Sequence, residues 1–455
     1  MKNILALIFL ISSFTQAQYS INGTMSPTIK SDWVTLHKIE GARQFFIKST
    51  KIKIDSFTIE GKKQTLGRFN FTLPKKTKVG TYRITYSLEG EGFVDFIYNK
   101  ENINFGFHPA YPNQSVTFTD SKENKIYRTY LDQKSKAQQY LDSIQILALQ
   151  NPDSNLKRKY KTALKKVNSI QQKYLKASEG MYVLPFIEAS LSNSPSEIIR
   201  SPEKYMSNII DTFFNKIDFN NKTLLNSFFL VDRITEYIFS IHYSDDIATQ
   251  QKLYKKSVDK VFSKIEVISF KKDMIEFLIS QFEAYKNLEL IDYLFENHYN
   301  KLPIDVQNKK FKEDKLSILA AEVGRIAPDF SWKENDKTLT LSKLKDAKNY
   351  LLIFWSTGCS HCLREIPELH KFLNENKEVK VIAFSLEKND LSWKKHKNKL
   401  PNWHHILGLN KWKNKTARTY NISSTPSYFV LNADKKIIAK PKHLKEVKRF
   451  FTDRY

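Results

Sequence analysis

The chain has 455 residues, of which 41% are hydrophobic and 13% aromatic. This is too long for one compact core and apolar enough to exclude wholesale disorder, so we expect two or three folded domains. The formal net charge is +25, but the lysines are scattered among acids and asparagines and form no compact basic block. We therefore expect no nucleic-acid partner. Association with an anionic membrane surface stays open, without specific support.

The first residues are typical of an export signal. Lys2 precedes the apolar stretch 4–14, and the run from Thr15 to Ala17 has the form of a small-residue cleavage site. The stretch is too short to cross a bilayer, and no later segment reaches about 18 uncharged apolar residues. We expect residues 1–17 to be a signal peptide that directs the chain to the periplasm or cell envelope. The alternative is a buried N-terminal helix.

Residues 18–120 alternate between apolar and polar positions. The clearest run of apolar residues at every second position is Tyr82, Ile84, Tyr86 and Leu88. Similar short runs occur near positions 52, 69 and 103, with turn residues between them. This pattern predicts an antiparallel, β-sandwich-like domain.

Residues 121–322 change to a helical period. Met274, Leu278, Phe282 and Tyr285 lie four, four and three residues apart, and glycine is almost absent. The pattern predicts an all-α region. Its expected helices cover 123–150, 155–178, 205–242 and 248–297. An aromatic stripe at helical spacing usually packs in a core, so we assign this region no chemistry.

Residues 323–455 show a third pattern. A continuous apolar run over 350–355 is typical of a strand buried on both faces. A helical stretch over 359–376 and a second buried-strand run over 379–386 follow it. This order predicts a βαβ unit with a parallel sheet, hence an α/β domain. A hairpin over 427–431 and 436–440 and a final helix near 444–451 complete it.

The chain has only two cysteines, Cys359 and Cys362, where the first buried strand meets the helix. A zinc site needs further ligands, and a c-type haem site needs histidine where Leu363 stands. Disulfide exchange needs only the two thiols. Backbone N–H groups at the helix N-terminus favour the Cys359 thiolate, which would attack, while the less exposed Cys362 would resolve the mixed disulfide. We expect no cofactor and no metal.

Two further elements complete the candidate site. His361, between the cysteines, could stabilise the Cys359 thiolate and raise the reduction potential; the alternative is a surface residue without a tuning role. Thr425 and Pro426 precede an apolar run, which predicts a tight turn with Pro426 in the cis form. If this turn faces the cysteines, the Thr425 backbone can pair with an extended substrate segment.

These motifs resemble the thioredoxin-like superfamily, specifically the TlpA/ResA-type envelope thiol-disulfide oxidoreductases. The segments 327–330 and 341–344, the Cys362-x-x-Glu365-x-Pro367 pattern and Pro426 carry the resemblance. It implies a thioredoxin fold over 323–455, with a family-specific strand–helix insertion over 387–410. The upstream part is similar to Bacteroidetes-type exported proteins that place a β-domain and a helical region before such a domain.

Two departures from the family bear on the chemistry. Gly358 stands where the family commonly has tryptophan, which could loosen the site or alter partner contact. Ile353 replaces the buried aspartate of thioredoxin, so the proton acceptor for Cys362 is unassigned. Glu365 is a candidate, against the alternatives of a surface carboxylate or a helix salt bridge. The direction of electron flow stays open.

The leading interpretation is an envelope thiol-disulfide oxidoreductase acting on cysteine-containing envelope proteins together with a redox partner protein. The alternative is an envelope binding or scaffold protein whose thioredoxin domain serves mainly for docking. A peroxidase of the same superfamily would need a Pro-x-x-x-Thr-x-x-Cys site, whereas Thr357 lies only two residues before Cys359.

Overall fold

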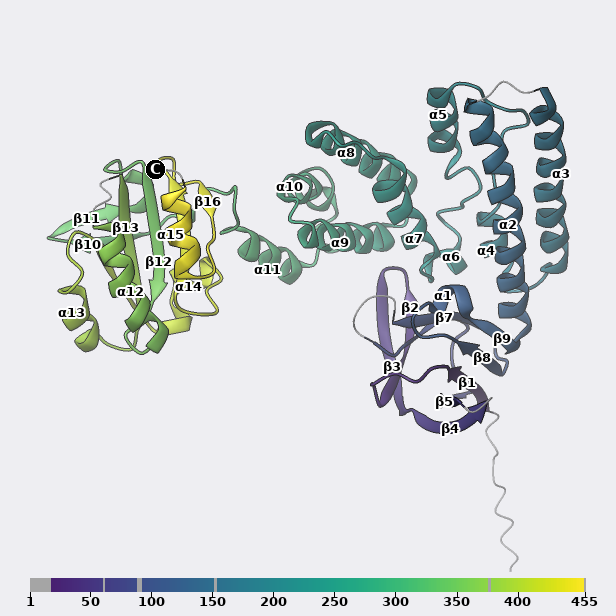
Figure 1. Cartoon of the computed structure of the whole chain (residues 1–455), viewed down its shortest axis with the longest axis horizontal. Coiled ribbons are helices and arrows are strands. Elements are labelled where there is room, and N and C mark those ends of the chain that lie inside the picture. Colours follow the sequence, from purple (N-terminus) through teal and green to yellow (C-terminus); the bar gives the residue numbers. More distant parts are fainter. Residues whose placement is uncertain (1–17, 60–61, 88–91, 151–153, 375–377, 454–455) are drawn as a thin grey trace, which may run out of the picture. The chain divides into compact units, whose positions relative to one another are not determined.

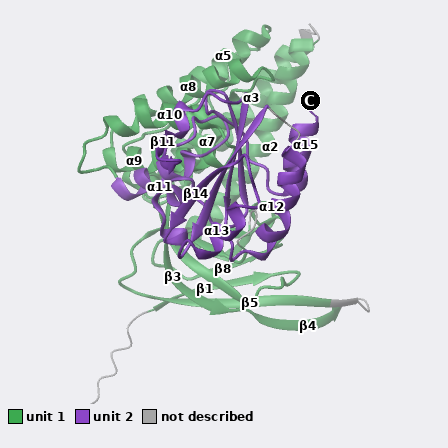
Figure 2. Cartoon of the chain, turned by 90° about the vertical axis from the view of Figure 1, so that its left-hand side faces the viewer, with its two compact units in different colours: residues 1–307 green, residues 308–455 purple. Residues whose placement is uncertain are grey.

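The computed structural model describes residues 18–59, 62–87, 92–150, 154–374 and 378–453. The chain divides into two compact units, residues 1–307 and 308–455, which Figure 2 colours separately. The segment expected to be a signal peptide, 1–17, lies outside the described residues. Within the described ranges, no helix is long and apolar enough to span a bilayer.

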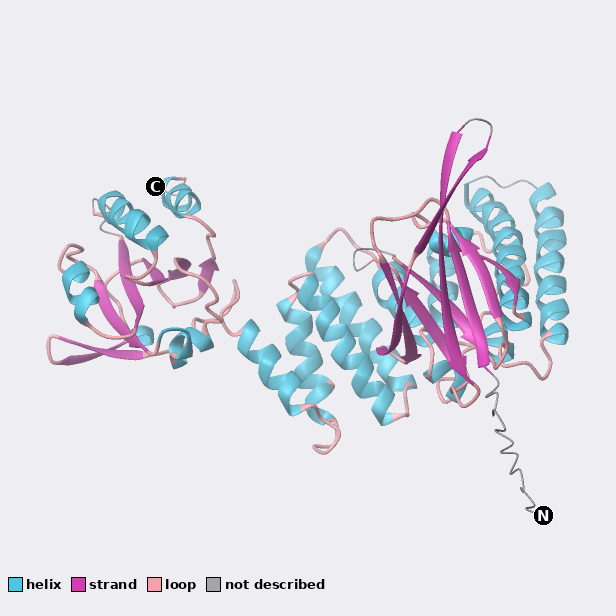
Figure 3. Ribbon diagram, turned by 90° about the horizontal axis from the view of Figure 1, so that it is seen from below, coloured by secondary structure: helices cyan, strands magenta, loops and turns pink. Residues whose placement is uncertain are grey.

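The first unit begins with two β-sheets that share one hydrophobic core (Figure 3). One sheet has the order β4-β5-β1-β8-β9 and the other β3-β2-β6-β7. Their elements are β1 (Gln18–Met25), β2 (Trp33–Glu40), β3 (Arg43–Lys51), β4 (Lys53–Ile59), β5 (Lys62–Pro74), β6 (Gly80–Thr85), β7 (Phe93–Tyr98), β8 (Ile103–Phe107), the short helix α1 (Pro112–Ser115) and β9 (Thr117–Asp120). The predicted inward face is present: Tyr82, Ile84 and Tyr86 are buried, whereas Leu88 lies outside the described residues. The pairs are antiparallel except β1 with β8, which is parallel.

A helical region follows within the same unit, and α2 and α3 pack side by side (Figure 1). Its elements are α2 (Lys122–Gln150), α3 (Ser154–Ala177), α4 (Leu184–Ala189), α5 (Pro202–Thr212), α6 (Lys222–Leu225), α7 (Phe229–Glu236), the π-helical η1 (Tyr237–Ile241), α8 (Ile247–Lys264), α9 (Ile268–Ala284), α10 (Leu288–Asn297) and the 3₁₀ turn η2 (Tyr299–Lys301). The expected long helices 205–242 and 248–297 are therefore each interrupted. Lys286 takes a left-handed φ of 55° after α9, and the Asn287 side chain caps α10 by accepting from Leu290 N–H.

The second unit is an α/β domain with the sheet order β14-β13-β12-β15-β16. Its elements are α11 (Lys309–Leu319), β10 (Ser331–Glu334), β11 (Lys337–Thr340), η3 (Leu341–Lys343), β12 (Asn349–Trp355), α12 (Ser360–Leu373), β13 (Val379–Glu387), α13 (Leu391–Lys397), β14 (His404–Leu409), η4 (Lys411–Lys413), α14 (Lys415–Thr419), β15 (Ser427–Asn432), β16 (Ile437–Ala439) and α15 (Leu444–Thr452). β12, β13 and β14 run parallel, as the βαβ pattern predicts, and β15 pairs antiparallel with β12. The expected insertion 387–410 contains α13 and β14.

Two hydrophobic cores cover the two faces of this sheet. Residues of α12 and α15 pack on one face around Ile353 and Trp355, and residues of α14 and the β10–β11 hairpin pack on the other around Tyr350 and Phe354. Because both faces are covered, β12 is buried along almost its whole length, which explains its uninterrupted apolar sequence. The unit includes α11, which the sequence pattern had assigned to the helical region. The three predicted structural classes, β-rich, helical and α/β, are confirmed in this order.

Candidate active site

The two cysteines lie where β12 ends and α12 begins. A short turn joins the two elements: Cys359 N–H donates to the Ser356 carbonyl (3.1 Å), and Gly358 N–H donates to Ser356 Oγ (3.2 Å). Cys359 is the N-cap of α12, and its Sγ accepts a hydrogen bond from Cys362 N–H at 3.2 Å. The free amide groups of the first helical turn therefore face this sulfur, as the sequence predicted.

This placement favours ionisation of Cys359. Partial burial by itself opposes the thiolate, but hydrogen bonds from the Cys362 and Thr425 side chains and from the Cys362 and His361 backbone outweigh it, so the pKa of Cys359 is lowered. The residue is half-buried, so its sulfur can still be reached from solvent. These are the properties of an attacking thiol.

Cys362 has the opposite environment. It is fully buried in the core beneath α12, together with Ile353, Trp355 and Tyr428. Burial raises the pKa of its thiol, and the hydrogen bond to Cys359 raises it further. The pair therefore consists of one accessible thiol that ionises readily and one enclosed thiol that holds its proton.

His361 is exposed, and its ring does not hydrogen-bond Cys359 in the described structure. Its Nδ1 instead accepts from the Arg364 guanidinium at 3.1 Å. This contact orients the ring along the helix. What the residue supplies to Cys359 here is its backbone N–H. The tuning role of the ring stays a prediction.

The Thr425–Pro426 turn lies against Cys359. The peptide bond before Pro426 is cis, and the Thr425 carbonyl accepts a hydrogen bond from the Cys359 thiol at 3.2 Å. β15 starts directly after this turn and pairs with β12, which fixes the turn beside the cysteines. All five residues expected at the site are therefore close together, although pairing of Thr425 with a substrate stays a prediction.

Glu365 lies one helical turn beyond Cys362 and is partly buried. It accepts a hydrogen bond from the hydroxyl of Tyr428 at 2.9 Å. Tyr428 pairs with Ile353 in the sheet, so this tyrosine brings a polar group next to the strand position where thioredoxin has an aspartate. Burial and the Glu365 carboxylate raise the pKa of Tyr428, so its hydroxyl donates rather than accepts.

Glu387 is a structural member of the site that the sequence did not reveal. It ends β13, and its side chain is 5% exposed. One carboxylate oxygen accepts from Thr357 N–H (2.6 Å) and Ser385 Oγ (2.7 Å), and the other accepts from Thr357 Oγ1 (2.9 Å). Glu387 thus holds the turn that presents Cys359. The available signal was an acid at the carboxyl end of a buried parallel strand, where such sheets place functional groups.

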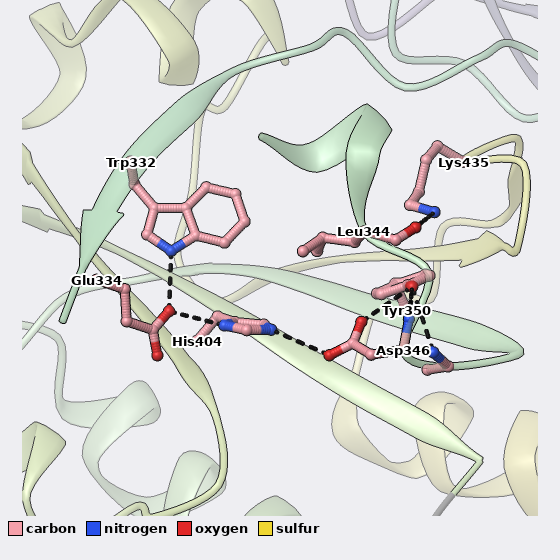
Figure 4. A network of polar contacts seen from close by, with 8 residues as sticks. Trp332, Glu334, Leu344, Asp346, Tyr350, His404 and Lys435 are labelled. Carbon is pink, nitrogen blue, oxygen red and sulfur yellow. Dashed lines mark hydrogen bonds and ion pairs between the residues drawn. The ribbon is translucent and has the colours of Figure 1, made fainter. Parts of the chain in front are cut away.

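A second polar cluster lies at the opposite edge of the sheet, near the starts of β12 and β14 (Figure 4). Glu334 accepts from Trp332 Nε1 (3.1 Å) and contacts His404 Nδ1 (2.7 Å). The other ring nitrogen of His404 lies 3.6 Å from Asp346. The cluster joins the β10–β11 hairpin to the sheet and is separate from the cysteines. Across the described ranges, no three His, Cys, Asp or Glu side chains are arranged to hold a metal ion.

Comparisons with known proteins agree on the C-terminal part. Residues 346–437 match a family model described as thioredoxin-like. A thiol-disulfide oxidoreductase ResA from Bacillus thuringiensis (strain Al Hakam) is 28% identical over 124 residues, which are 26% of this chain and 68% of the relative. ResA from Oceanobacillus iheyensis is 37% identical over 76 residues, 15% of this chain and 39% of the relative.

Solved structures give similar matches. The thioredoxin domain of a thiol-disulfide oxidoreductase from Bacteroides vulgatus is 25% identical, covers 29% of this chain and 97% of its own, and has a TM-score of 0.27. A thiol-disulfide oxidoreductase from Bacteroides fragilis is 23% identical, covers 29% of this chain and 100% of its own, and has a TM-score of 0.26.

Proposed function

Because the C-terminal unit is a thioredoxin-like domain with ResA proteins among its relatives, we propose that this chain exchanges disulfides with other proteins through Cys359 and Cys362. The observation that carries the proposal is the asymmetry of the two thiols. The Cys359 sulfur sits at the N-terminus of α12 with a lowered pKa, and Cys362 is enclosed one turn away with a raised pKa.

The exchange follows from this asymmetry. The Cys359 thiolate attacks one sulfur of a substrate disulfide, so that a Cys359–substrate bond forms and the other substrate sulfur leaves as a thiolate. Cys362 then loses its proton and attacks Cys359, which releases the second substrate thiol and leaves a Cys359–Cys362 disulfide. Two electrons pass from the pair to the substrate, and the reverse sequence oxidises a substrate dithiol.

We also propose that the chain works in the periplasm or cell envelope, on cysteine-containing proteins there and with a redox partner protein. The proposal is supported by the export-like character of residues 1–17. N-terminal sequencing of the mature protein from its native host should then begin near Gln18. Recovery of the uncleaved chain from the cytoplasm would contradict the proposal.

The decisive measurement is the reduction potential of the pair in the intact chain, taken by equilibration with thiol–disulfide buffers. A value near about −180 mV or higher indicates an oxidant or isomerase, and one near about −270 mV indicates a reductase. Cys359→Ser should abolish exchange, and Cys362→Ser should trap a mixed disulfide. Absence of a reversible dithiol–disulfide couple would refute the function. A potential unchanged in His361→Ala would refute the tuning role of that ring.

A further inference from the structure

A rigid turn follows β14 at the edge of the sheet that carries Cys359. Asn410 and Lys411 both have left-handed backbone angles, with φ of 70° and 47°. Lys413 N–H donates to the Asn410 carbonyl (2.9 Å), Asn414 N–H to the Lys411 carbonyl (3.0 Å), and the Asn414 side chain to the Leu409 carbonyl (3.1 Å). The backbone of Lys411 is therefore fixed by its neighbours on both sides.

The side chain of Lys411 reaches the active-site turn. A Cβ placed on Gly358 would lie 4.0 Å from Lys411 Nζ, an ordinary van der Waals distance. The φ of Gly358 lies outside the left-handed region, so this backbone does not require glycine. Lys411 is half-buried, and because Gly358 has no side chain, no side chain of that residue lies over the ammonium group.

This ammonium group has no carboxylate partner in the structure as described. The buried carboxylate of Glu387 is already engaged on both oxygens by Thr357 and Ser385. Glu365 accepts from Tyr428. The acids positioned near the cysteines therefore make contacts within the domain. The Lys411 ammonium group can instead pair with an acidic group of a bound substrate.

Other cations lie on the same edge. Because β12, β13 and β14 are parallel, the segments that follow them meet at one edge of the sheet. Lys388 follows β13 directly, Lys413 lies two residues after Lys411, and Arg364 lies near the start of α12; all three are exposed. The surface around Cys359 therefore attracts anionic groups.

The strand order indicates which part of a bound substrate segment would lie near Lys411. β15, which begins after Thr425, lies on one side of β12, whereas β13 and β14 lie on the other. A chain segment that paired with the Thr425 backbone and crossed Cys359 away from β15 would continue toward Lys411. The residue next to the substrate cysteine would then lie beside the ammonium group.

We propose that Lys411 is a substrate-recognition residue that selects proteins carrying an acidic side chain next to the reacting cysteine. The proposal rests on the proposed disulfide exchange at Cys359 and names the class of substrate for it. A partly solvated ion pair of this kind accelerates the reaction a few-fold, and salt screens it.

The test uses the intact reduced chain and short peptides whose single cysteine carries a 2-pyridyl disulfide. Attack by Cys359 forms the Cys359–peptide disulfide and releases 2-thiopyridone, whose absorbance gives the second-order rate. The peptides differ only beside the cysteine, where they carry Asp, Asn or Lys. At low ionic strength we expect the Asp peptide to react about 3- to 5-fold faster than the Asn peptide, and the advantage to shrink in high salt.

Lys411→Gln should remove most of this preference while the Asn peptide keeps its rate, and Lys411→Arg should retain the preference. Lys436→Gln is the matched control, since Lys436 is an exposed lysine in the β15–β16 turn at the far end of the sheet. A preference that is absent from the wild type, or intact in Lys411→Gln, overturns the assignment of Lys411 alone. Failure of every peptide to react overturns the disulfide exchange itself.

Discussion

Replacing Glu387 by alanine should destabilise the second unit strongly, because three hydrogen-bond donors depend on this one carboxylate. Thr357 N–H, Thr357 Oγ1 and Ser385 Oγ all donate to it at 2.6–2.9 Å. Glu387 and Ser385 are buried, so water cannot readily replace the lost acceptor at Ser385. Thr357 is only half-buried, so water can partly satisfy its two donors.

The expected size follows from these three donors. A buried donor left without a partner costs about 1–3 kcal/mol. If Ser385 bears the full cost and each of the two donors of Thr357 bears about half of it, the free energy of unfolding should fall by about 2–6 kcal/mol. Glu387→Gln keeps one oxygen as an acceptor and should lose about half as much.

Hydrogen exchange in increasing urea, followed on peptides from β12 and β13 of the intact chain, measures this change locally. Glu368→Ala is the matched control, since Glu368 is an exposed glutamate of α12 paired with Lys448 at 2.6 Å. It should cost less than about 1 kcal/mol. If Glu387→Ala cost no more than Glu368→Ala, the carboxylate would not hold the turn.

Two further predictions concern pH. The pKa of Cys359 is lowered and that of Cys362 is raised. The rate at which iodoacetamide alkylates Cys359 should therefore have its pH midpoint below about 8.5, and Cys362 should stay unmodified in the folded chain. Equal labelling of the two cysteines would refute the asymmetry. Burial opposes ionisation of Glu334, but its hydrogen bonds with His404 and Trp332 lower its pKa overall. The contribution of the Glu334 carboxylate to stability is then complete above its pKa in the unfolded chain, about 4.3, and is lost as the pH falls through its lower pKa in the folded chain. Glu334→Gln should therefore reduce the free energy of unfolding more at pH 7 than at pH 3.5.

The parts of the site that the sequence predicted depend on neighbours along the chain. The helix N-terminus at Cys359 and the turn before Pro426 each follow from a few adjacent residues. Glu387 and Lys411 were missed because their roles arise only when separate strands align at one edge of the sheet. Their own surroundings in the sequence, the end of an apolar run and a lysine-rich loop, occur in many proteins without such a role.

The fold shows the same distinction. The change of apolar period from two to helical correctly separated the β-rich region from the helical one. It could not locate every helix end, because the apolar spacing continues across the break at Lys286, where the backbone turns left-handed and Asn287 starts a new helix. Ile54 fits the alternating pattern but is 56% exposed, since periodicity does not reveal which strands lie at the edge of a sheet.

The difference between the two thiols needs no charged residue of its own, because it follows from how β12 and α12 are joined. The apolar run of β12 forms one side of a core that α12 must cover, so the inward face of the helix, which carries Cys362 and Ile366, is buried. Burial raises the pKa of Cys362, while the turn leaves Cys359 at the helix end, where amide groups stabilise its thiolate. Ile353 can therefore replace the aspartate of thioredoxin without removing this asymmetry. The replacement removes a base beside Cys362. The Tyr428–Glu365 hydrogen bond supplies a polar pair on the neighbouring strand and on α12.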